Sequence, residues 1–193
     1  RYIIYDQPHR TLDWAFDVTG YGGLDTLPGF QNVAVSATKL GAAHLSLGYK
    51  NVRSSLGSVE PEKGLEWRAT GSEYYAVSQS FPKLRLDLNL GVPLPISHAS
   101  AWLYTSAGVS GGDSEQPYGN FYFGGFGNNY VDSREIKRYR ESSSFPGADI
   151  NAIAGTRYSR AMLDVNLPPI RFERLGIGAE VALGHGVLGV VAK

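Results

Sequence analysis

The sequence predicts an all-β protein built from about eight to ten antiparallel strands. Composition is the first reason: 24 of the 193 residues are glycine, 12 are tyrosine and only 19% are charged. Average soluble domains contain about 7% glycine and about 25% charged residues. The second reason is that apolar and polar residues alternate along much of the chain, as they do in strands, where successive side chains point to opposite faces.

The expected strands are the stretches in which this alternation is clearest. In order, they lie at residues 12–18, 43–50, 65–70, 83–96, 99–109, 120–123, 160–167 and 175–183. In the best case, 83–96, one face collects Leu84, Leu86, Leu88, Leu90, Val92, Leu94 and Ile96. A helix would scatter these side chains around its axis, so the pattern favours a strand.

The connections between the expected strands differ in length. Residues 95–98 predict a short turn, and the stretches 51–64 and 111–117 predict longer polar loops. The longest irregular stretch is 127–155, which contains a charged run at 134–141. Asp132 or Ser133 is a suitable cap for one short helix over that run. A loop of this length in a compact β domain usually has a function.

Several classes of protein are excluded. The length allows a single domain over residues 1–193, or a large piece of one. Lys plus Arg and Asp plus Glu number 18 each, which argues against a nucleic-acid partner. There is no cysteine for a disulfide, a thiolate metal site or a nucleophile. Residues 1–6 lack the apolar core of a signal peptide, and 88–112, the longest stretch without Asp, Glu, Lys or Arg, is too rich in proline and polar residues for a transmembrane helix.

No catalytic or metal centre is expected. The four histidines, at positions 9, 44, 98 and 185, are scattered singly. The G-x-G-x-x-G pattern at 184–189 is followed only by Val190 to Lys193, too few residues for the helix that phosphate binding requires. We therefore expect no enzyme activity, no catalytic residue and no cofactor. A hydrolase on a β scaffold stays open, because the spatial separation of the carboxylates is unknown at this stage.

Charged residues recur on the polar side of the expected strands. They include Asp13, Asp17, Arg85, Asp87, Arg160 and Asp164. Such a face fits either the solvated outside of a soluble sandwich or the polar lumen of a membrane barrel, and the alternation does not separate the two. Trp14, Trp67 and Trp102 flank apolar strand centres, as interfacial aromatic residues do, and this favours the barrel.

Several stretches, spread over most of the chain, resemble a known superfamily. Residues 121–130, Phe-Tyr-Phe-Gly-Gly-Phe-Gly-Asn-Asn-Tyr, are similar to the start of the long inward-folding loop in barrels of the bacterial surface antigen superfamily. Residues 145–151 and 162–172 look like the end of that loop and its return strand. Residues 27–32 and 54–59 are similar to the C-terminal barrels attached to TolB-like propeller proteins.

The resemblance implies an antiparallel up-and-down membrane β-barrel, or a large part of one, in the bacterial outer membrane. Its partners would be membrane lipid and, in the full-length protein, an N-terminal periplasmic propeller; its role would be in transport, translocation or assembly, with the cargo unknown. The chain ends without the usual terminal aromatic residue, so we interpret it as part of a barrel. The alternative is a soluble antiparallel β-sandwich or barrel that binds a ligand.

The resemblance also assigns a structural or gating role to the long loop. The residues concerned are Gly124, Gly125, Asn128, Asn129, Arg138, Arg140, Phe145, Pro146 and Gly147. We expect 127–155 to fold into or across the mouth of the barrel, on the outer side. Counting strands from there places 111–117 on the periplasmic side and 95–98 outside.

Overall fold

The structure is a computed structural model that describes residues 2–7, 9–24, 37–56, 58, 61–112, 115–124, 148–149 and 152–167. Within these ranges there are nine strands and no α-helix, so the expected all-β antiparallel fold is confirmed. The strands are β1 (Tyr2–Gln7), β2 (Arg10–Gly22), β3 (Lys39–Arg53), β4 (Lys63–Ala76), β5 (Gln79–Pro93), β6 (Ser100–Ser110), β7 (Phe121–Phe123), β8 (Ile153–Gly155) and β9 (Arg157–Asn166). A short 3-10 helix, η2 (Pro117–Gly119), precedes β7.

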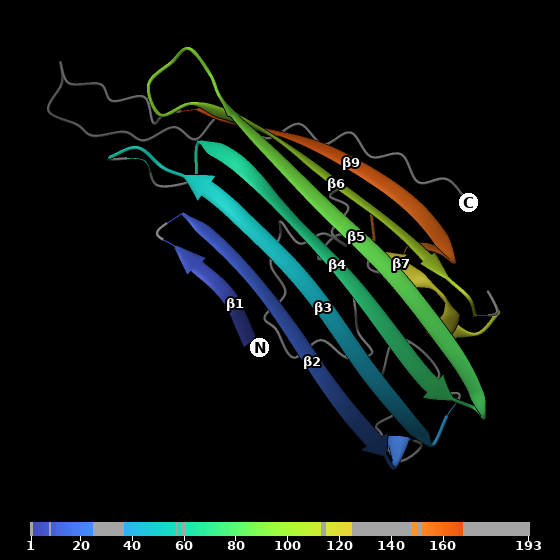
Figure 1. The fold of residues 1–193 in the computed structure, drawn as a ribbon. Coiled ribbons are helices and arrows are strands. Elements are labelled where there is room, and N and C mark those ends of the chain that lie inside the picture. The colour runs from blue at the N-terminus through green and yellow to red at the C-terminus, as the bar shows by residue number, and fades with distance from the viewer. Residues whose placement is uncertain are drawn as a thin grey trace, which may run out of the picture.

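Seven strands form one sheet in the order β1-β2-β3-β4-β5-β6-β9 (Figure 1). Every neighbouring pair is antiparallel, so the sheet is an up-and-down meander. β1 and β9 are its outer strands, and no pairing among the described residues joins them. The remaining two strands, β7 and β8, pair with each other in a separate small sheet.

The placement of the connections differs from the sequence-based expectation. Residues 120–123 were expected to be a strand like the others, but β7 is only three residues long and pairs with β8. Because it does not cross the main sheet, 111–117 and the described flanks of 127–155 both belong to the connection between β6 and β9, at one end of the sheet. The turn at 95–98 joins β5 to β6 at the opposite end. The expectation that 111–117 lies on the side opposite to 127–155 is therefore wrong for the described flanks of 127–155, and so is the expectation that 95–98 shares their side.

Two elements had no clear signal in the sequence. β1 contains the unbroken apolar run from Tyr2 to Tyr5, and its pairing with β2 is interrupted by an irregularity between Ile3 and Tyr5. The turn between β4 and β5 is made by Val77 and Ser78, with φ of 52° and 58°. Two positive φ values are typical of a tight hairpin turn, in which asparagine and glycine are the favoured residues. Because the turn here is made of valine and serine, the sequence does not predict it.

Several expectations concern residues outside the described ranges. They are the short helix over 134–141, the strand at 175–183, the glycine pattern at 184–189 and the stretch 27–32. In the described part of the chain, no helix has the length and apolar character needed to cross a membrane.

The cross-strand register gives the sheet two chemically different faces. Directly paired residues share a face, and one row across six strands consists of Asp13, Gly48, Arg68, Asp87, Ser106 and Arg160. The adjacent row lies on the other face and consists of Trp14, Leu47, Ala69, Leu86, Ala107 and Ser159. We call these the polar face and the apolar face.

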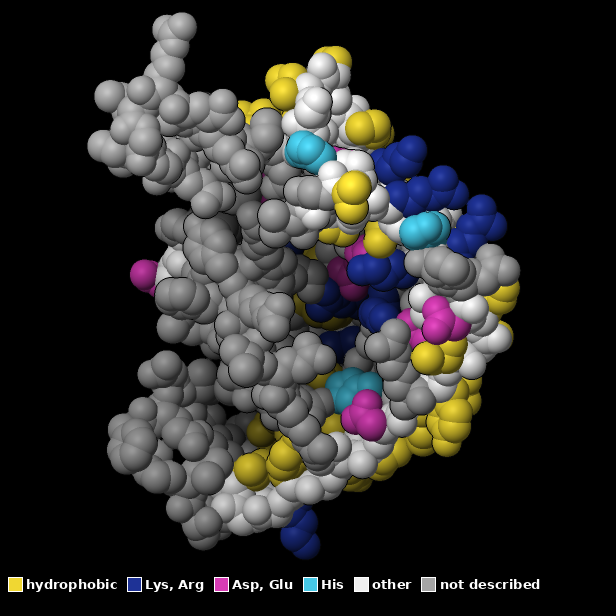
Figure 2. Space-filling model, turned by 90° about the vertical axis from the view of Figure 1, so that its left-hand side faces the viewer, with side chains coloured by type: hydrophobic (Ala, Val, Ile, Leu, Met, Phe, Trp, Pro, Cys, Tyr) yellow, Lys and Arg dark blue, Asp and Glu magenta, His cyan; other side chains and the backbone are white. Residues whose placement is uncertain are grey.

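Burial on the two faces is the reverse of that in an ordinary soluble sheet. Leu84 and Leu86, on the apolar face, are 57% and 52% exposed, whereas Asp13 and Arg160, on the polar face, are 4% and 6% exposed. Figure 2 shows Lys and Arg side chains gathered in a hollow and hydrophobic side chains along an outer margin. Some charged residues of the polar face, such as Asp13 and Arg160, are thus more sheltered than the leucines of the apolar face.

A small apolar core lies at one end of the polar face. Leu40, Ala42, Tyr74, Ala76, Phe81 and Tyr118 belong to it. Tyr118 comes from η2, and its ring lies 5.9 Å from that of Phe81. The connection after β6 therefore packs back onto the polar face, at the end where the core forms.

Trp102 does not occupy the interfacial position expected for it. Trp14 and Trp67 lie on the apolar face, but Trp102 lies on the polar face and is 3% exposed. Its indole N–H donates to the Pro61 carbonyl at 2.9 Å, and its ring covers Gly91 on the neighbouring strand. Trp102 therefore fastens the loop between β3 and β4 to the polar face.

We predict that Gly91→Ala destabilises the protein by about 1–3 kcal/mol, as overpacking generally does. A Cβ atom at Gly91 would lie 2.4 Å from the Trp102 ring. The matched control is Gly41→Ala, where the nearest heavy atom would be 3.9 Å away. That change should leave stability equal or slightly higher, because alanine loses less chain entropy than glycine. Denaturant unfolding followed by tryptophan fluorescence measures both; equal effects would contradict the prediction.

Candidate functional site

The six charged residues predicted to line a lumen all lie on the polar face. Asp13, Asp87 and Arg160 share one row, Arg85 stands in the next row, and Asp17 and Asp164 lie two rows away on either side. Asp13, Arg160 and Asp164 are buried, Arg85 and Asp87 are half-buried, and Asp17 is exposed. The polar face of the central strands is therefore the candidate functional site.

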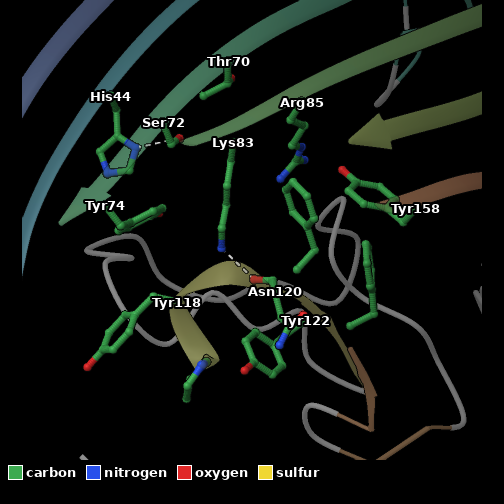
Figure 3. A pocket seen from close by; sticks show the side chains of 13 residues that line it. His44, Thr70, Ser72, Tyr74, Lys83, Arg85, Tyr118, Asn120, Tyr122 and Tyr158 are labelled. Atoms are coloured by element: carbon green, nitrogen blue, oxygen red, sulfur yellow. Dashed lines mark hydrogen bonds between the residues drawn. The ribbon is translucent and has the colours of Figure 1, made fainter. Parts of the chain in front are cut away.

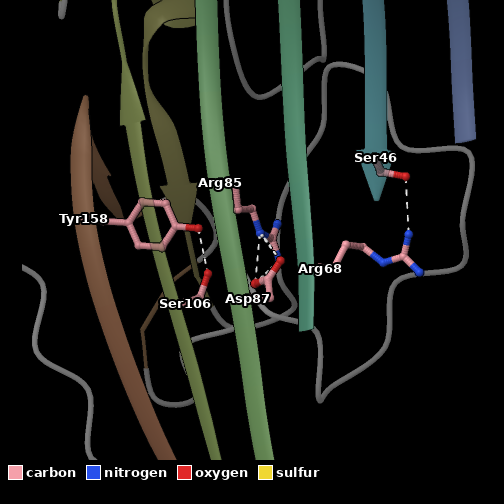
Figure 4. A network of polar contacts seen from close by, with 6 residues as sticks. All are labelled: Ser46, Arg68, Arg85, Asp87, Ser106 and Tyr158. Carbon is pink, nitrogen blue, oxygen red and sulfur yellow. Dashed lines mark hydrogen bonds and ion pairs between the residues drawn. The ribbon is translucent and has the colours of Figure 1, made fainter. Parts of the chain in front are cut away.

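Arg85 and Asp87 form the best-defined ion pair of this site (Figure 4). They are two residues apart on β5, so both side chains point to the same face. Arg85 Nε donates to both carboxylate oxygens of Asp87, at 3.0 and 2.8 Å, and Nη2 donates to Oδ1 at 2.9 Å. Such bidentate geometry fixes both side chains and is stronger than a single contact between neutral groups.

Arg68 reaches across a neighbouring strand to Asp13. Gly48 stands between them in the row, and the Arg68 guanidinium lies over it, so close that a Cβ atom there would be 2.7 Å from Nη2. This route brings Arg68 Nη2 to 3.6 Å from Asp13 Oδ2, while Nη1 donates to Ser46 Oγ at 3.3 Å. A glycine at position 48 is what leaves room for this contact.

The charges along the central row alternate in sign. Asp13, Arg68, Asp87 and Arg160 follow one another across the strands, with uncharged residues between some of them. These side chains line a cavity of about 440 Å³, which also includes Lys50 and Glu66, themselves an ion pair at 2.8 Å. The cavity wall is therefore charged but close to electrically balanced.

A second cavity of about 170 Å³ lies between the polar face and the segment 117–124 (Figure 3). Its sheet side includes His44, Ser72 and Lys83, and His44 Nδ1 is 2.9 Å from Ser72 Oγ. On the opposite side lie the rings of Tyr118 and Tyr122. The Lys83 side chain points from β5 into this space, toward Asn120.

The segment 117–124 is anchored to the polar face by aromatic and polar contacts. The rings of Phe121 and Phe123 meet Tyr158 edge to face, at 4.8 and 4.6 Å between centroids. Lys83 Nζ donates to the Asn120 carbonyl at 2.6 Å. The Tyr158 hydroxyl in turn lies 2.8 Å from Ser106 Oγ.

The residues expected to form a gating motif are only partly described. Gly124 follows β7 and is buried. The others lie outside the described ranges: Gly125, Asn128, Asn129, Arg138, Arg140, Phe145, Pro146 and Gly147. The expectation that 127–155 folds into a barrel mouth stays a prediction. The described residues on its two sides belong to, or adjoin, the small sheet of β7 and β8.

A polar cluster ties two loops together at the opposite end of the sheet. The Glu62 carboxylate accepts hydrogen bonds from the Ser55 hydroxyl at 2.9 Å and the Ser55 amide at 3.1 Å, and lies 3.2 Å from His98 Nδ1. The Ser55 hydroxyl is the main cause that lowers the pKa of Glu62; burial opposes it, and the Ser55 amide and His98 lower it further.

This cluster does not have the geometry of a nucleophile, base and acid. Ser55 Oγ is also 3.2 Å from His98 Nδ1, so the serine and the carboxylate share one ring nitrogen. A catalytic histidine uses one nitrogen for the nucleophile and the other for the acid. Among the described residues there is also no group of three or more His, Cys, Asp or Glu side chains that could hold a metal ion.

The structure brings further residues into the site besides the six charged ones. The alternating patterns place Arg68 and Lys83 on the polar side of their strands, and the register confirms this. Tyr158 and Gly48 are different, because their roles depend on a cross-strand neighbour that only the register identifies. Comparison with protein-family models, with curated proteins and with solved structures finds no match.

We predict that Asp87→Asn lowers stability by about 1–2 kcal/mol, because the half-buried Arg85 loses its charged partner. Asp17→Asn is the matched control: the same chemical change on the same face, at an exposed side chain. It should change stability by less than about 0.5 kcal/mol. Denaturant unfolding at low and high salt measures both, and equal effects would contradict the role of the Arg85–Asp87 pair.

A second prediction concerns acid pH. The pKa of Glu62 is lower in the folded than in the unfolded protein, so its contacts stabilise the loop at pH above the unfolded pKa. That stabilisation disappears as the pH falls through the folded pKa. Hydrogen exchange of the Ser55 amide should therefore lose protection in acid, beyond the intrinsic pH dependence of exchange. In Glu62→Gln, this additional loss of Ser55 protection in acid should be absent. If the loss persists in the variant, another titratable group causes it.

Proposed function

We propose that this chain forms part of the wall of a bacterial outer-membrane β-barrel, with its apolar face toward lipid and its polar face toward an aqueous lumen. The observation that supports this is the separation of charge. On the apolar face of the described strands, charged residues occur only near the two ends, as with Glu73 at one end and Arg53 and Lys63 at the other. Between them, the two central rows, which contain Leu86 and Leu88, are uncharged across the described strands.

The height of the uncharged region also suits a membrane. On β5 itself, no charged residue stands on the apolar face from Pro82 to Val92, although Pro82 pairs with Glu73 on β4. At roughly 3.4 Å per residue this stretch is about 34 Å along the strand. With the tilt of about 40° found in membrane barrels, the region would span roughly 26 Å, close to the usual apolar band of about 25 Å.

Exposed leucines favour a lipid environment over water. Leu84, Leu86, Leu90, Leu103 and Leu163 are between 39% and 57% exposed and stand on one face of three neighbouring strands. A patch of this kind on a soluble monomer would need a covering partner. In lipid it is covered by acyl chains, and the backbone groups are satisfied by the sheet.

The role inside the membrane is proposed to be transport, translocation or assembly, with the cargo open. Two features support it: the charged, hollowed polar face, and the packing of the segment 117–124 onto that face. The resemblance of residues 121–130 to the loop of surface antigen barrels points the same way. The competing function is a soluble ligand-binding β protein, and the next experiment separates the two.

We predict that Leu86→Arg lowers folding stability in lipid vesicles by about 2–4 kcal/mol, as arginine does on the lipid face near the midplane. The control is Asn89→Arg on the same strand, where the side chain is on the polar face and the Glu66 carboxylate is 3.4 Å from the Asn89 amide nitrogen. This change should be tolerated. Folding is measured by heat-modifiable gel mobility and urea titration in vesicles.

Two results would contradict the membrane assignment. One is an equal effect of the two arginines in vesicles. The other is a wild-type chain that folds and stays monomeric in buffer without detergent or lipid, which would support the soluble alternative.

A further inference from the structure

The smaller cavity contains a cation, Lys83, to which the described residues offer no anionic partner. Lys83 is half-buried, and its ammonium donates one hydrogen bond, to the Asn120 carbonyl. It lies 5.0 Å from the Tyr74 ring centroid and 5.2 Å from that of Phe121. An ammonium has three N–H donors, so these partners leave two donors without an acceptor and the positive charge without a counter-charge among the described residues.

No carboxylate is found among the described residues that line this cavity. Asp17 shares the row of Lys83 but stands three strands away, about 14 Å at a strand spacing of about 4.8 Å. Asp87 is four residues along β5 and is already held by Arg85. A sheltered cation is normally paired with an anion, and here the described side chains supply none within reach.

The rest of the lining is largely aromatic and hydroxyl-bearing; it also includes His44, Asn120 and Arg85, whose guanidinium pairs with Asp87. Tyr74, Tyr118, Phe121 and Tyr122 offer ring surfaces, and Ser72 offers a hydroxyl (Figure 3). The cavity volume of about 170 Å³ is slightly larger than that of an engineered apolar cavity, of roughly 150 Å³, that binds benzene. A ligand with one ring-sized apolar body fits this space.

We infer that the cavity between the polar face and the segment 117–124 binds a small organic acid, with its carboxylate on the Lys83 ammonium and a ring-sized body against the aromatic side chains. Lys83 would then supply the charge, and the Tyr74 and Phe121 rings would hold its side chain in place. The inference goes beyond the proposed membrane function and does not rest on it, because a soluble β protein could hold the same site.

The test is calorimetric titration of the full folded chain with sodium benzoate, benzyl alcohol and sodium acetate. Benzoate should bind at one site per chain. Benzyl alcohol, which has the ring without the charge, and acetate, which has the charge without the ring, should each bind at least tenfold more weakly.

Variants then test the role of Lys83. Lys83→Met should weaken benzoate binding at least tenfold, and Lys83→Arg should retain most of it. Lys50→Met is the matched control, because Lys50 is on the same face but pairs with Glu66 in the other cavity; its affinity should equal that of the wild type. Circular dichroism establishes that each variant keeps its β structure.

Several outcomes would overturn the inference: no saturable benzoate binding to the wild type, or equal affinity in the wild type and Lys83→Met. Equal binding of benzyl alcohol would overturn the role of the charge, and equal binding of acetate would overturn the role of the ring. If Lys83→Met fails to fold, the ligand comparison on the wild type and on Lys83→Arg decides. The titration uses chain that is already folded, in detergent or in buffer as its folding requires. Its outcome is therefore separate from the outcome of the membrane test.

Discussion

The register of the sheet is the constraint on which the other features depend. One face carries Asp13, Arg68, Asp87 and Arg160. They share it because every antiparallel pairing in the series from β2 to β9 places polar-face residues opposite polar-face residues. If one pairing slipped by a single residue, the charges beyond it would move to the leucine side. The ion pairs, the cavities and the uncharged band all follow from this one alignment.

Glycine contributes to the polar face in a consistent way. Gly48, Gly91 and Gly108 are each paired directly with a large residue, which is Arg68, Trp102 or Tyr158 respectively. In each case a Cβ atom on the glycine would come within 2.7 Å of that partner's side chain. The partners can therefore lie over the sheet instead of standing upright, which leaves room for the cavities. Part of the glycine excess in the sequence has this steric explanation.

The main strands and the identity of the two faces could be predicted because they depend on period two alone. Leu84 to Val92 and Asp13 to Val18 show that period directly. Val77 and Ser78 could not be recognised as a turn, because they lack the residues that favour positive φ. The short strand at 121–123 was predicted as a strand, but its place outside the main sheet was not, since alternation over three residues does not show which strand it pairs with.

The site could be predicted only as far as which side chains share a face. The pairing of Arg85 with Asp87 follows from spacing along one strand, yet the reach of Arg68 to Asp13 requires Gly48 to be the residue between them. The sheltered position of Lys83 depends on a segment more than 30 residues later, Asn120 and its neighbours, folding back onto β5. No local pattern encodes a contact of that kind.

The alternation of faces also limits how such a chain can change in length during evolution. Inserting one residue in the middle of β5 would exchange the environments of Asp87 and Leu88 and of every residue beyond them. Insertion of two residues would preserve the faces and only displace the row. The connection between β6 and β9 can gain or lose any number of residues, because its length does not decide which face a strand residue occupies. Variation in length should therefore concentrate at the ends of the sheet, and where it occurs within strands it should come in pairs.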